Sequence, residues 1–330
     1  MKKLLSVILA LVMILSLSTV AFADTTEEPT TDMEKVTLTK VYKLANEGTT
    51  SPAEAFEFTD MTFVSATDTG VEYNDEAAKT KLPTIGKAEY AAGAATIAGT
   101  KVSVDITLPT YDAVGVYNYT FVEKNNGTAG VEYHTNLIKL KVTVVDVDGI
   151  KRVAAVHTEE EGGQKSNEFE NTYSAGSLSV KKIVTGNMGD KQKDFDVTVT
   201  FKAPADKTVK EEIKYTVGTE EKSITDSDWN NNTASVQITL KHDQTITFTN
   251  IPYGVTYTVV EDKYSDYETT YVGDNGTIGA PSAEATITNN KGATVDTGIV
   301  LDSMPYVLLL AVAAMGLAVL LTKKRASRED

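Results

Sequence analysis

Alternation of apolar and polar residues runs through most of the chain between its two apolar ends. The pattern is clearest in six segments: 101–108 (KVSVDITL), 115–122 (GVYNYTFV), 138–147 (IKLKVTVVDV), 195–201 (FDVTVTF), 234–240 (ASVQITL) and 255–262 (VTYTVVED). A period of two residues indicates half-buried strands. Asn126-Gly127 and Asn275-Gly276 are typical of hairpin turns, and only Ala-rich pieces such as 88–98 (AEYAAGAATIA) favour a helix, weakly. The pattern therefore predicts an all-β chain of sandwich type.

The strand pattern repeats once, with a division near Ser174. The first unit opens with KVTLTK and closes with EFENT, and the second opens with SLSVKK and closes with TITNN. Each unit also contains a similar strand that ends in Glu, GVYNYTFVE in the first and GVTYTVVE in the second. The Lys of the opening strand precedes this Glu by 83 residues in the first unit and by 79 in the second. We therefore predict two tandem β-sandwich domains, residues 35–173 and 174–290.

Strand parity places one Lys, one Glu and one Asn of each unit on an inward-facing stripe, because residues two apart share a face. The residues are Lys40, Glu123 and Asn171 in the first unit, and Lys182, Glu261 and Asn289 in the second. The neighbouring Lys181 and Asn290 fall on the opposite parity. Two sets of the same residue types, in the same order and parity, indicate a shared role.

These residue types suggest one reaction. Burial pushes a Lys toward its neutral, nucleophilic form and a Glu toward its protonated form. A neutral amine can attack the side-chain carbonyl of an Asn, while a protonated Glu polarises that carbonyl and shuttles protons. Ammonia would leave and an isopeptide bond would remain, formed once within the chain and without turnover.

Both ends of the chain carry targeting signals. Residues 1–23 have a basic start, an apolar centre and small residues at the end, which predicts a secretory signal peptide cleaved between Ala23 and Asp24. An acidic linker, residues 24–34, follows. Near the other end, the apolar run 306–321 is short for a helix that spans a bilayer, which needs ~20 apolar residues. The basic residues 323–325 after it place the body of the protein outside the cell.

Composition narrows the classes of function. The chain has no Cys, so covalent reinforcement of an exported protein would need chemistry other than disulfides. Between Asp24 and Thr297, 43 acidic residues outnumber 25 basic ones, a net charge of −18, which argues against nucleic acid as a partner. The three histidines, at positions 134, 157 and 242, show no metal-ligand spacing. Because no hydrolase or nucleotide-binding motif is present, we predict no metal, no cofactor and no turnover enzyme.

The motifs VTLTK, GVYNYTFVE, EFENT, SLSVKKIVTG and TITNN resemble those of Gram-positive, streptococcal-type major pilins with isopeptide-linkage domains, over nearly all of residues 35–290. The resemblance implies two immunoglobulin-like sandwiches, each crosslinked between its first and last strands. It pairs Lys40 with Asn171 beside Glu123, and Lys182 with Asn289 beside Glu261. The implied function is a structural subunit of a covalent pilus on the cell surface.

Residues 291–330 resemble a sortase sorting signal, with a Thr-Gly pair, an apolar segment and a basic tail. The resemblance implies that a sortase cleaves between Thr297 and Gly298 and transfers Thr297 to an amine of another molecule. The apolar segment would then hold the chain in the membrane only temporarily. The usual motif contains a Pro, whereas Val295 and Asp296 stand here, which leaves open which sortase recognises it.

In related pilins the lysine that accepts the Thr lies just upstream of the bond-forming Asn. Lys165, in the polar loop EEEGGQKSNEFEN, is the candidate in this chain, and Lys124 and Lys207 are other loop lysines that could serve. The expected partners are a sortase, identical subunits, peptidoglycan and, further, accessory pilins and a host ligand. Two alternatives stay open: a monomeric wall-anchored adhesin, and an enzyme whose site leaves no motif.

Overall fold

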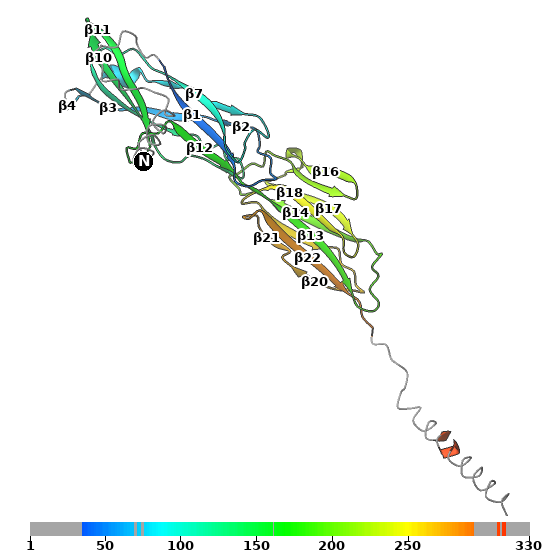
Figure 1. Ribbon diagram of the computed structural model, residues 1–330. Coiled ribbons are helices and arrows are strands. Elements are labelled where there is room, and N and C mark those ends of the chain that lie inside the picture. The colour runs from blue at the N-terminus through cyan, green and yellow to red at the C-terminus, as the bar shows by residue number, and fades with distance from the viewer. Residues whose placement is uncertain are drawn as a thin grey trace, which may run out of the picture.

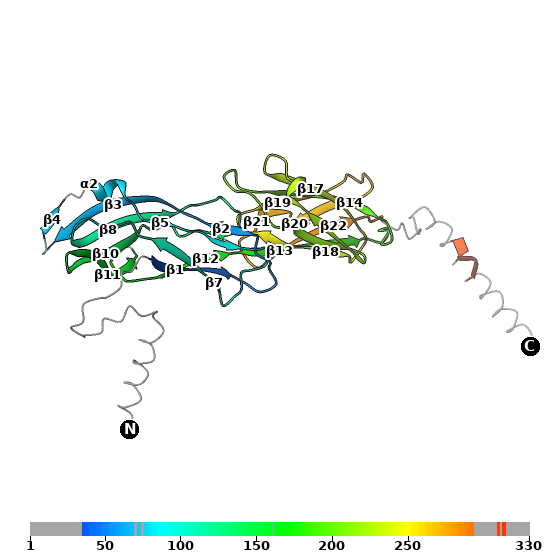
Figure 2. The ribbon, with the colours of Figure 1, turned by 90° about the horizontal axis from the view of Figure 1, so that it is seen from above.

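The computed structural model describes residues 35–68, 71–73, 76–160, 162–293, 309–310 and 312–314. Two β-sandwiches lie end to end and form an elongated body (Figures 1 and 2). The predicted all-β fold with tandem sandwiches is confirmed. The predicted signal peptide with its cleavage site at Ala23 and Asp24, the acidic linker, and the Thr297-Gly298 pair lie outside the described residues.

The described part of the first sandwich contains two five-stranded sheets. One has the order β5-β7-β1-β12-β9, with bounds Thr84–Ile85, Thr100–Thr107, Lys35–Leu44, Glu168–Tyr173 and Val131–Glu132. The facing sheet has the order β11-β10-β8-β3-β4, with bounds Ile150–Glu159, Ile138–Val147, Gly115–Glu123, Phe58–Asp68 and Val71–Tyr73. A small ribbon of β2 (Glu54–Phe56) and β6 (Ala88–Tyr90) and the short helix α2 (Glu76–Thr80) complete this half.

The second sandwich pairs a six-stranded sheet with a four-stranded one. The larger has the order β16-β15-β18-β13-β22-β20, with bounds Glu220–Ile224, Ile213–Val217, Thr245–Pro252, Ala175–Thr185, Ser282–Asn290 and Glu268–Val272. The smaller has the order β17-β14-β19-β21, with bounds Thr233–Leu240, Phe195–Lys202, Thr256–Glu261 and Asn275–Thr277. A single 3-10 turn spans Asp226–Asp228 in the described residues of this half.

The first and last strands of each sandwich pair in parallel, β1 with β12 and β13 with β22. The other pairings between the named strands of the described chain are antiparallel. Only Ser174 separates the end of β12 from the start of β13. The closing strand of one sandwich therefore continues almost directly into the opening strand of the next.

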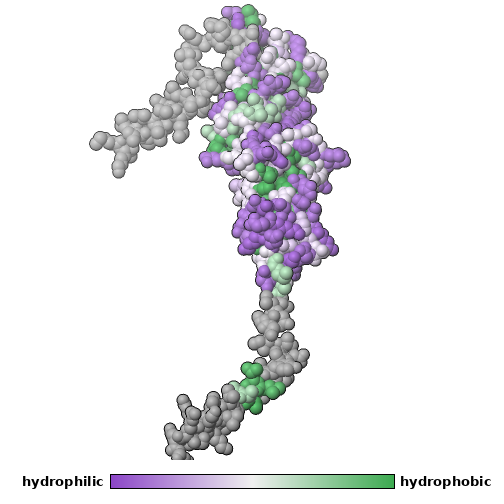
Figure 3. Space-filling model, turned by 90° about the vertical axis from the view of Figure 1, so that its right-hand side faces the viewer, coloured by the Kyte–Doolittle hydropathy of each residue, from purple (hydrophilic) through white to green (hydrophobic). Residues whose placement is uncertain are grey.

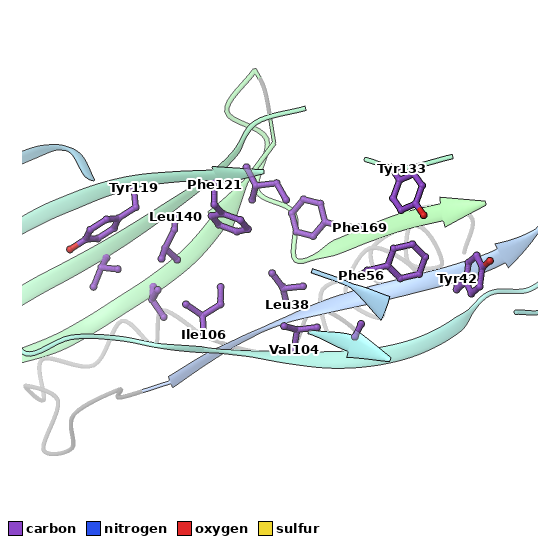
Figure 4. Packing of buried hydrophobic residues seen from close by; sticks show 14 of the residues in the cluster. Leu38, Tyr42, Phe56, Val104, Ile106, Tyr119, Phe121, Tyr133, Leu140 and Phe169 are labelled. Carbon is purple, nitrogen blue, oxygen red and sulfur yellow. The ribbon is translucent and has the colours of Figure 1, made fainter. Parts of the chain in front are cut away.

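Each sandwich has its own core, built from the inward-facing residues of the alternating strands. In the first, Leu38, Val104 and Ile106 face Phe121 and Leu140 of the opposite sheet (Figure 4). Burying such side chains is the main stabilising contribution to a sandwich of this kind. The outward-facing residues are mostly hydrophilic on the face that Figure 3 shows, as the alternating pattern predicts.

Several local predictions are wrong. Asn126-Gly127 is not a hairpin turn but part of a segment that contacts the second sandwich, and Asn275-Gly276 lies within β21, opposite Tyr257 and Thr258. Residues 88–98 form β6 and turns rather than a helix, because Ala88 and Tyr90 alternate into the core. Within the described part of the chain, no helix is long and apolar enough to cross a membrane, and the predicted membrane segment 306–321 lies largely outside that part.

Candidate crosslinking sites

Lys40 and Asn171 lie on neighbouring parallel strands of one sheet. Lys40 pairs with Phe169 and Asn171 pairs with Tyr42, so the two are offset by two residues and their side chains share the inward face. Glu123 is the last residue of β8 and reaches them from the facing sheet. The sandwich therefore brings together three predicted site residues that are far apart in the sequence.

The three side chains contact one another in the core of the first sandwich. Lys40 Nζ donates a hydrogen bond to Glu123 Oε2, and Asn171 Nδ2 donates to Glu123 Oε1 at 2.5 Å. Asn171 Nδ2 also donates to the main-chain carbonyl of Glu132 at 3.0 Å. The Lys40 and Glu123 side chains are 0% exposed. The Glu123 carboxyl group therefore bridges a buried amine and a buried amide.

The second sandwich repeats this geometry. Lys182 pairs with Ile287 and Asn289 pairs with Val184, which gives the same two-residue offset. Glu261, the last residue of β19, again comes from the facing sheet. Lys182 Nζ lies 2.5 Å from Glu261 Oε2, and Asn289 Nδ2 donates to Glu261 Oε1 at 2.6 Å. The predicted triads are thus assembled at matching positions of both sandwiches.

Burial lowers the pKa of Lys40 and of Lys182, and the neighbouring Glu opposes the shift in each case. Aromatic rings supply much of the apolar surroundings. Lys40 Nζ lies 5.2 Å from the ring centroid of Phe56, and Lys182 Nζ lies 4.4 Å from that of Phe195. A lowered pKa increases the fraction of neutral amine, which is the nucleophilic form.

His134, which follows β9, also contacts the crosslinking site of the first sandwich, and the sequence pattern did not predict this. The main-chain N–H of His134 donates to Glu123 Oε1 at 3.3 Å, and its ring packs on Phe169 with 5.3 Å between centroids. Burial lowers the pKa of His134. No pattern signals these contacts, since they depend on how residues 124–134 turn back over the strand end.

The candidate acceptor lysines lie elsewhere. Lys165 is exposed in the turn that connects β11 to β12, where its main chain forms an antiparallel β-bridge with that of Glu159. Lys124 forms an ion pair of 2.9 Å with Glu57, and Lys207 Nζ lies 5.9 Å from the ring centroid of Tyr133.

In the part of the chain that the structure describes, no cluster of His, Asp or Glu side chains is arranged to hold a metal ion.

Comparison with known proteins places this geometry in context. Residues 36–174 match the family described as Spy0128-like isopeptide containing domain, and residues 176–291 match a domain of unknown function (DUF7601). A curated pilin of Streptococcus pyogenes serotype M1 is 29% identical over an alignment of 332 positions, gaps included, which covers 93% of this chain and 96% of the pilin. The chain is thus similar to this streptococcal pilin over nearly its whole length, and its first sandwich matches the isopeptide containing domain.

Solved pilins share the fold. The major pilin of Streptococcus pyogenes superposes with a TM-score of 0.53 and 24% identity, over 80% of this chain and 100% of that one. The T3.2 major pilin of the same species gives a TM-score of 0.54 and 22% identity, over 79% and 99%. The resemblance that the motifs indicate is thus confirmed, and the double-sandwich architecture with it.

Proposed function

We propose that this chain is a structural subunit of a sortase-assembled pilus on a Gram-positive cell surface, stabilised by Lys40–Asn171 and Lys182–Asn289 isopeptide bonds. One observation carries the proposal: a buried Lys–Glu–Asn triad recurs with the same strand offset and the same facing-sheet Glu in both sandwiches. The likeness to streptococcal pilins supports it.

In each triad the Glu contacts both reacting groups, so it can carry a proton between them. The neutral Lys amine attacks the Asn side-chain carbonyl carbon, a C–N bond forms, and the Glu takes the proton of the attacking nitrogen. The contact from Glu Oε1 to Asn Nδ2 then delivers a proton to the leaving nitrogen. The C–N bond to that nitrogen breaks, ammonia leaves, and the Glu ends in its starting protonation state.

Assembly would follow the sorting signal. A sortase would cleave between Thr297 and Gly298 and pass Thr297 to an exposed lysine of the next subunit, or finally to peptidoglycan. Lys165 suits this role because it is exposed, unlike Lys40 and Lys182. Lys124 and Lys207 suit it less, because Lys124 opens the segment that contacts the second sandwich and Lys207 belongs to the loop that receives it. Accessory pilins and a host ligand would be further partners of the assembled filament.

The intact mass of purified residues 24–297 tests the internal bonds. Each bond removes one ammonia, so the mass should fall short of the sequence mass by two ammonias. A mass equal to the sequence mass would reject both bonds. Peptide mapping should then find the Lys40 peptide joined to the Asn171 peptide, and the Lys182 peptide joined to the Asn289 peptide.

Polymer formation tests the second half of the proposal. Co-expression with the cognate sortase should give a ladder of high-mass species on a denaturing gel, and Lys165→Arg should abolish it, because a guanidinium keeps the charge but does not act as the nucleophile. Lys124→Arg serves as the matched control and should leave the ladder intact. A full ladder from Lys165→Arg would exclude this lysine, and monomers from the unaltered chain would favour an anchored adhesin instead.

A further inference from the structure

A third Lys–Glu–Asn cluster lies where the two sandwiches meet. Glu54 of β2 is buried, with its side chain 1% exposed. Its Oε2 accepts hydrogen bonds from Lys210 Nζ at 3.0 Å and from the Thr128 hydroxyl, and its Oε1 accepts one from Asn126 Nδ2 at 2.9 Å. Lys210 belongs to the second sandwich, whereas Glu54 and Asn126 belong to the first. The cluster therefore joins the two halves of the molecule.

This cluster shares its connectivity with the two triads but not its surroundings. In all three, Oε2 faces the Lys and Oε1 faces the Asn. The Lys210 side chain, however, is 37% exposed, whereas those of Lys40 and Lys182 are fully buried. Burial of Glu54 opposes ionisation, but the hydrogen bonds from Thr128, Asn126 and Lys210 outweigh it and lower the pKa of Glu54. An ammonium facing a carboxylate is an ion pair, which lacks the neutral amine that attack on an amide requires.

The same region holds main-chain contacts between the sandwiches. Thr128 pairs with Thr208, Ala129 N donates to the Thr208 carbonyl at 2.9 Å, and Thr208 N donates to the Gly127 carbonyl at 2.8 Å. Ala129 is buried in the core of the second sandwich. Gly127 has φ +71° and lies so close to the Asp206 carbonyl that a Cβ would be 2.8 Å from that oxygen. Segment 124–130 is thus fitted closely against loop 204–210.

Segment 124–130 also connects parts of the first crosslinking site. It begins directly after Glu123 and leads into Glu132 and His134, whose main-chain groups contact Asn171 Nδ2 and Glu123 Oε1. We propose that the ion pair between Glu54 and Lys210, together with the hydrogen bond from Asn126, connects the two sandwiches and positions the first crosslinking site. This inference rests on the proposed function. Docking of the second sandwich fixes segment 124–130 and thereby holds Glu123 and the Glu132 carbonyl against Asn171. The first bond then forms fastest after the second sandwich has docked, whereas the second bond forms independently.

Lys210→Met tests the proposal, because it keeps an unbranched apolar side chain about as long as the lysine stem and removes the ammonium group. The chain is made by pulsed cell-free synthesis, and the crosslinked peptides of both sites are quantified by mass spectrometry over time. Loss of a hydrogen bond to a buried charged group, worth ~1.5 kcal/mol, corresponds to a roughly tenfold slower first bond. The second bond should keep its rate. Lys214→Met is the matched control, since the Lys214 side chain is exposed and forms an ion pair of 3.4 Å with Glu221, which is also exposed.

Gly127→Ala provides a second variant that acts through the backbone. Gly127→Ala should slow formation of the first bond selectively, because the new Cβ meets the Asp206 carbonyl. Gly149→Ala is its control: Gly149 has φ +80° but nothing within 4 Å of a Cβ.

A distance measurement tests the connection between the sandwiches directly. Spin labels at Ile150→Cys and Met188→Cys report the distance between the sandwiches, and the chain has no other Cys. Lys210→Met should broaden the distribution of distances between the two labels, because the sandwiches would be held together less rigidly.

The outcomes distinguish two claims: that the ion pair connects the two sandwiches, and that this connection positions the first crosslinking site. A slower first bond with a broader distance distribution supports the positioning role. A broader distribution with an unchanged rate overturns that role, and an unchanged distribution overturns the ion pair as a connection between the sandwiches. A third lost ammonia, with a Lys210–Asn126 peptide, would show a covalent link instead of an ion pair. If the unaltered chain forms neither bond, the proposed function fails, while the distance measurement still tests the connection.

Discussion

The two buried triads share their geometry but differ in what surrounds them. Both have the same strand offset and the same bridging Glu. The first is held by a second acceptor, the Glu132 carbonyl, and by His134, and it lies next to the junction of the sandwiches. The second lies beside a surface cavity lined by Glu261, Tyr264, Tyr267 and Tyr271, among others. The Lys, Glu and Asn and their strand register thus give both sites the same contacts between reacting groups. The neighbouring residues determine how close solvent comes to each site and how closely each site is connected to the other sandwich.

The largest contrast comes from removing one Glu at a time. Glu123→Ala should abolish only the first bond and Glu261→Ala only the second, because the Lys and Asn remain but lose their proton shuttle. Intact mass checks this: each variant should be heavier than expected for two bonds by one ammonia, after correction for the substitution. Glu170→Ala, an exposed neighbour of Asn171, should keep both bonds. Loss of both bonds from either variant would contradict independent sites.

Removing one Asn at a time should produce the next largest effect. The closed loops are of similar, long length in the two sandwiches, and the chain-entropy model gives roughly 5 kcal/mol for loops of this order. Asn171→Ala should therefore lower the melting temperature of the first sandwich, and Asn289→Ala that of the second. Calorimetry with limited proteolysis distinguishes the two transitions. Equal loss in both from one variant would mean that the contacts of segment 124–130 make them a single cooperative unit.

These contrasts rest on residues that the sequence identifies by parity alone. The alternation is regular around Lys182 and Asn289, whereas Lys40 begins a run of three buried residues with Val41 and Tyr42. All three polar side chains are buried. The same argument could have found Glu54, which shares its face with Phe56 in β2, but EAF is too short to stand out. Lys210 and Asn126 could not be found this way. Both lie in irregular loops, and their contact depends on how two separately folded sandwiches meet.

Turn signals failed for a related reason. Asn126-Gly127 does carry a positive φ at Gly127, which is the property that the pattern reports. The sequence does not say whether such a bend joins two strands or presents the chain to another domain. In β21, Gly276 lies opposite Tyr257, and its Cα faces the tyrosine ring so closely that a Cβ would lie 3.1 Å from the hydroxyl oxygen. Close packing, rather than a turn, accounts for glycine at this position.

A smaller effect should appear as a pH dependence of the unreacted first site. In Asn171→Ala the Lys40 amine stays free, and burial lowers its pKa from the ordinary 10.5. Between the lowered and the ordinary pKa the unfolded chain binds more protons than the folded one, so stability should rise with pH, by at most about 1.4 kcal/mol per unit. Urea unfolding from pH 7 to 9 measures the slope. The double variant Lys40→Met, Asn171→Ala should lose it, and an unchanged slope would show that Lys40 is not its source.

The smallest predicted effect concerns His134. Burial lowers the pKa of this imidazole from the ordinary 6.5, so the folded state favours its neutral form. Stability of the first sandwich should therefore fall as pH drops below the ordinary value, by at most about 1.4 kcal/mol per unit, until the lowered pKa is passed. His134→Asn should flatten the unfolding profile between pH 7 and 5. A profile with the same slope in both proteins would assign the acid sensitivity to other groups.

The near-continuous run of β12 and β13 has a mechanical consequence. With Lys165 as acceptor and Thr297 as donor, tension along a filament enters at 165, follows the chain through Ser174 to Lys182, crosses the amide to Asn289 and leaves toward 297. The remainder of both sandwiches lies outside this path, so a pulled filament would lengthen little. The proposed Lys40–Asn171 bond would also lie outside this path, so it would stabilise the fold of the first sandwich and would not add tensile strength. Single-molecule pulling should therefore show long extensions in Asn289→Ala and none in Asn171→Ala.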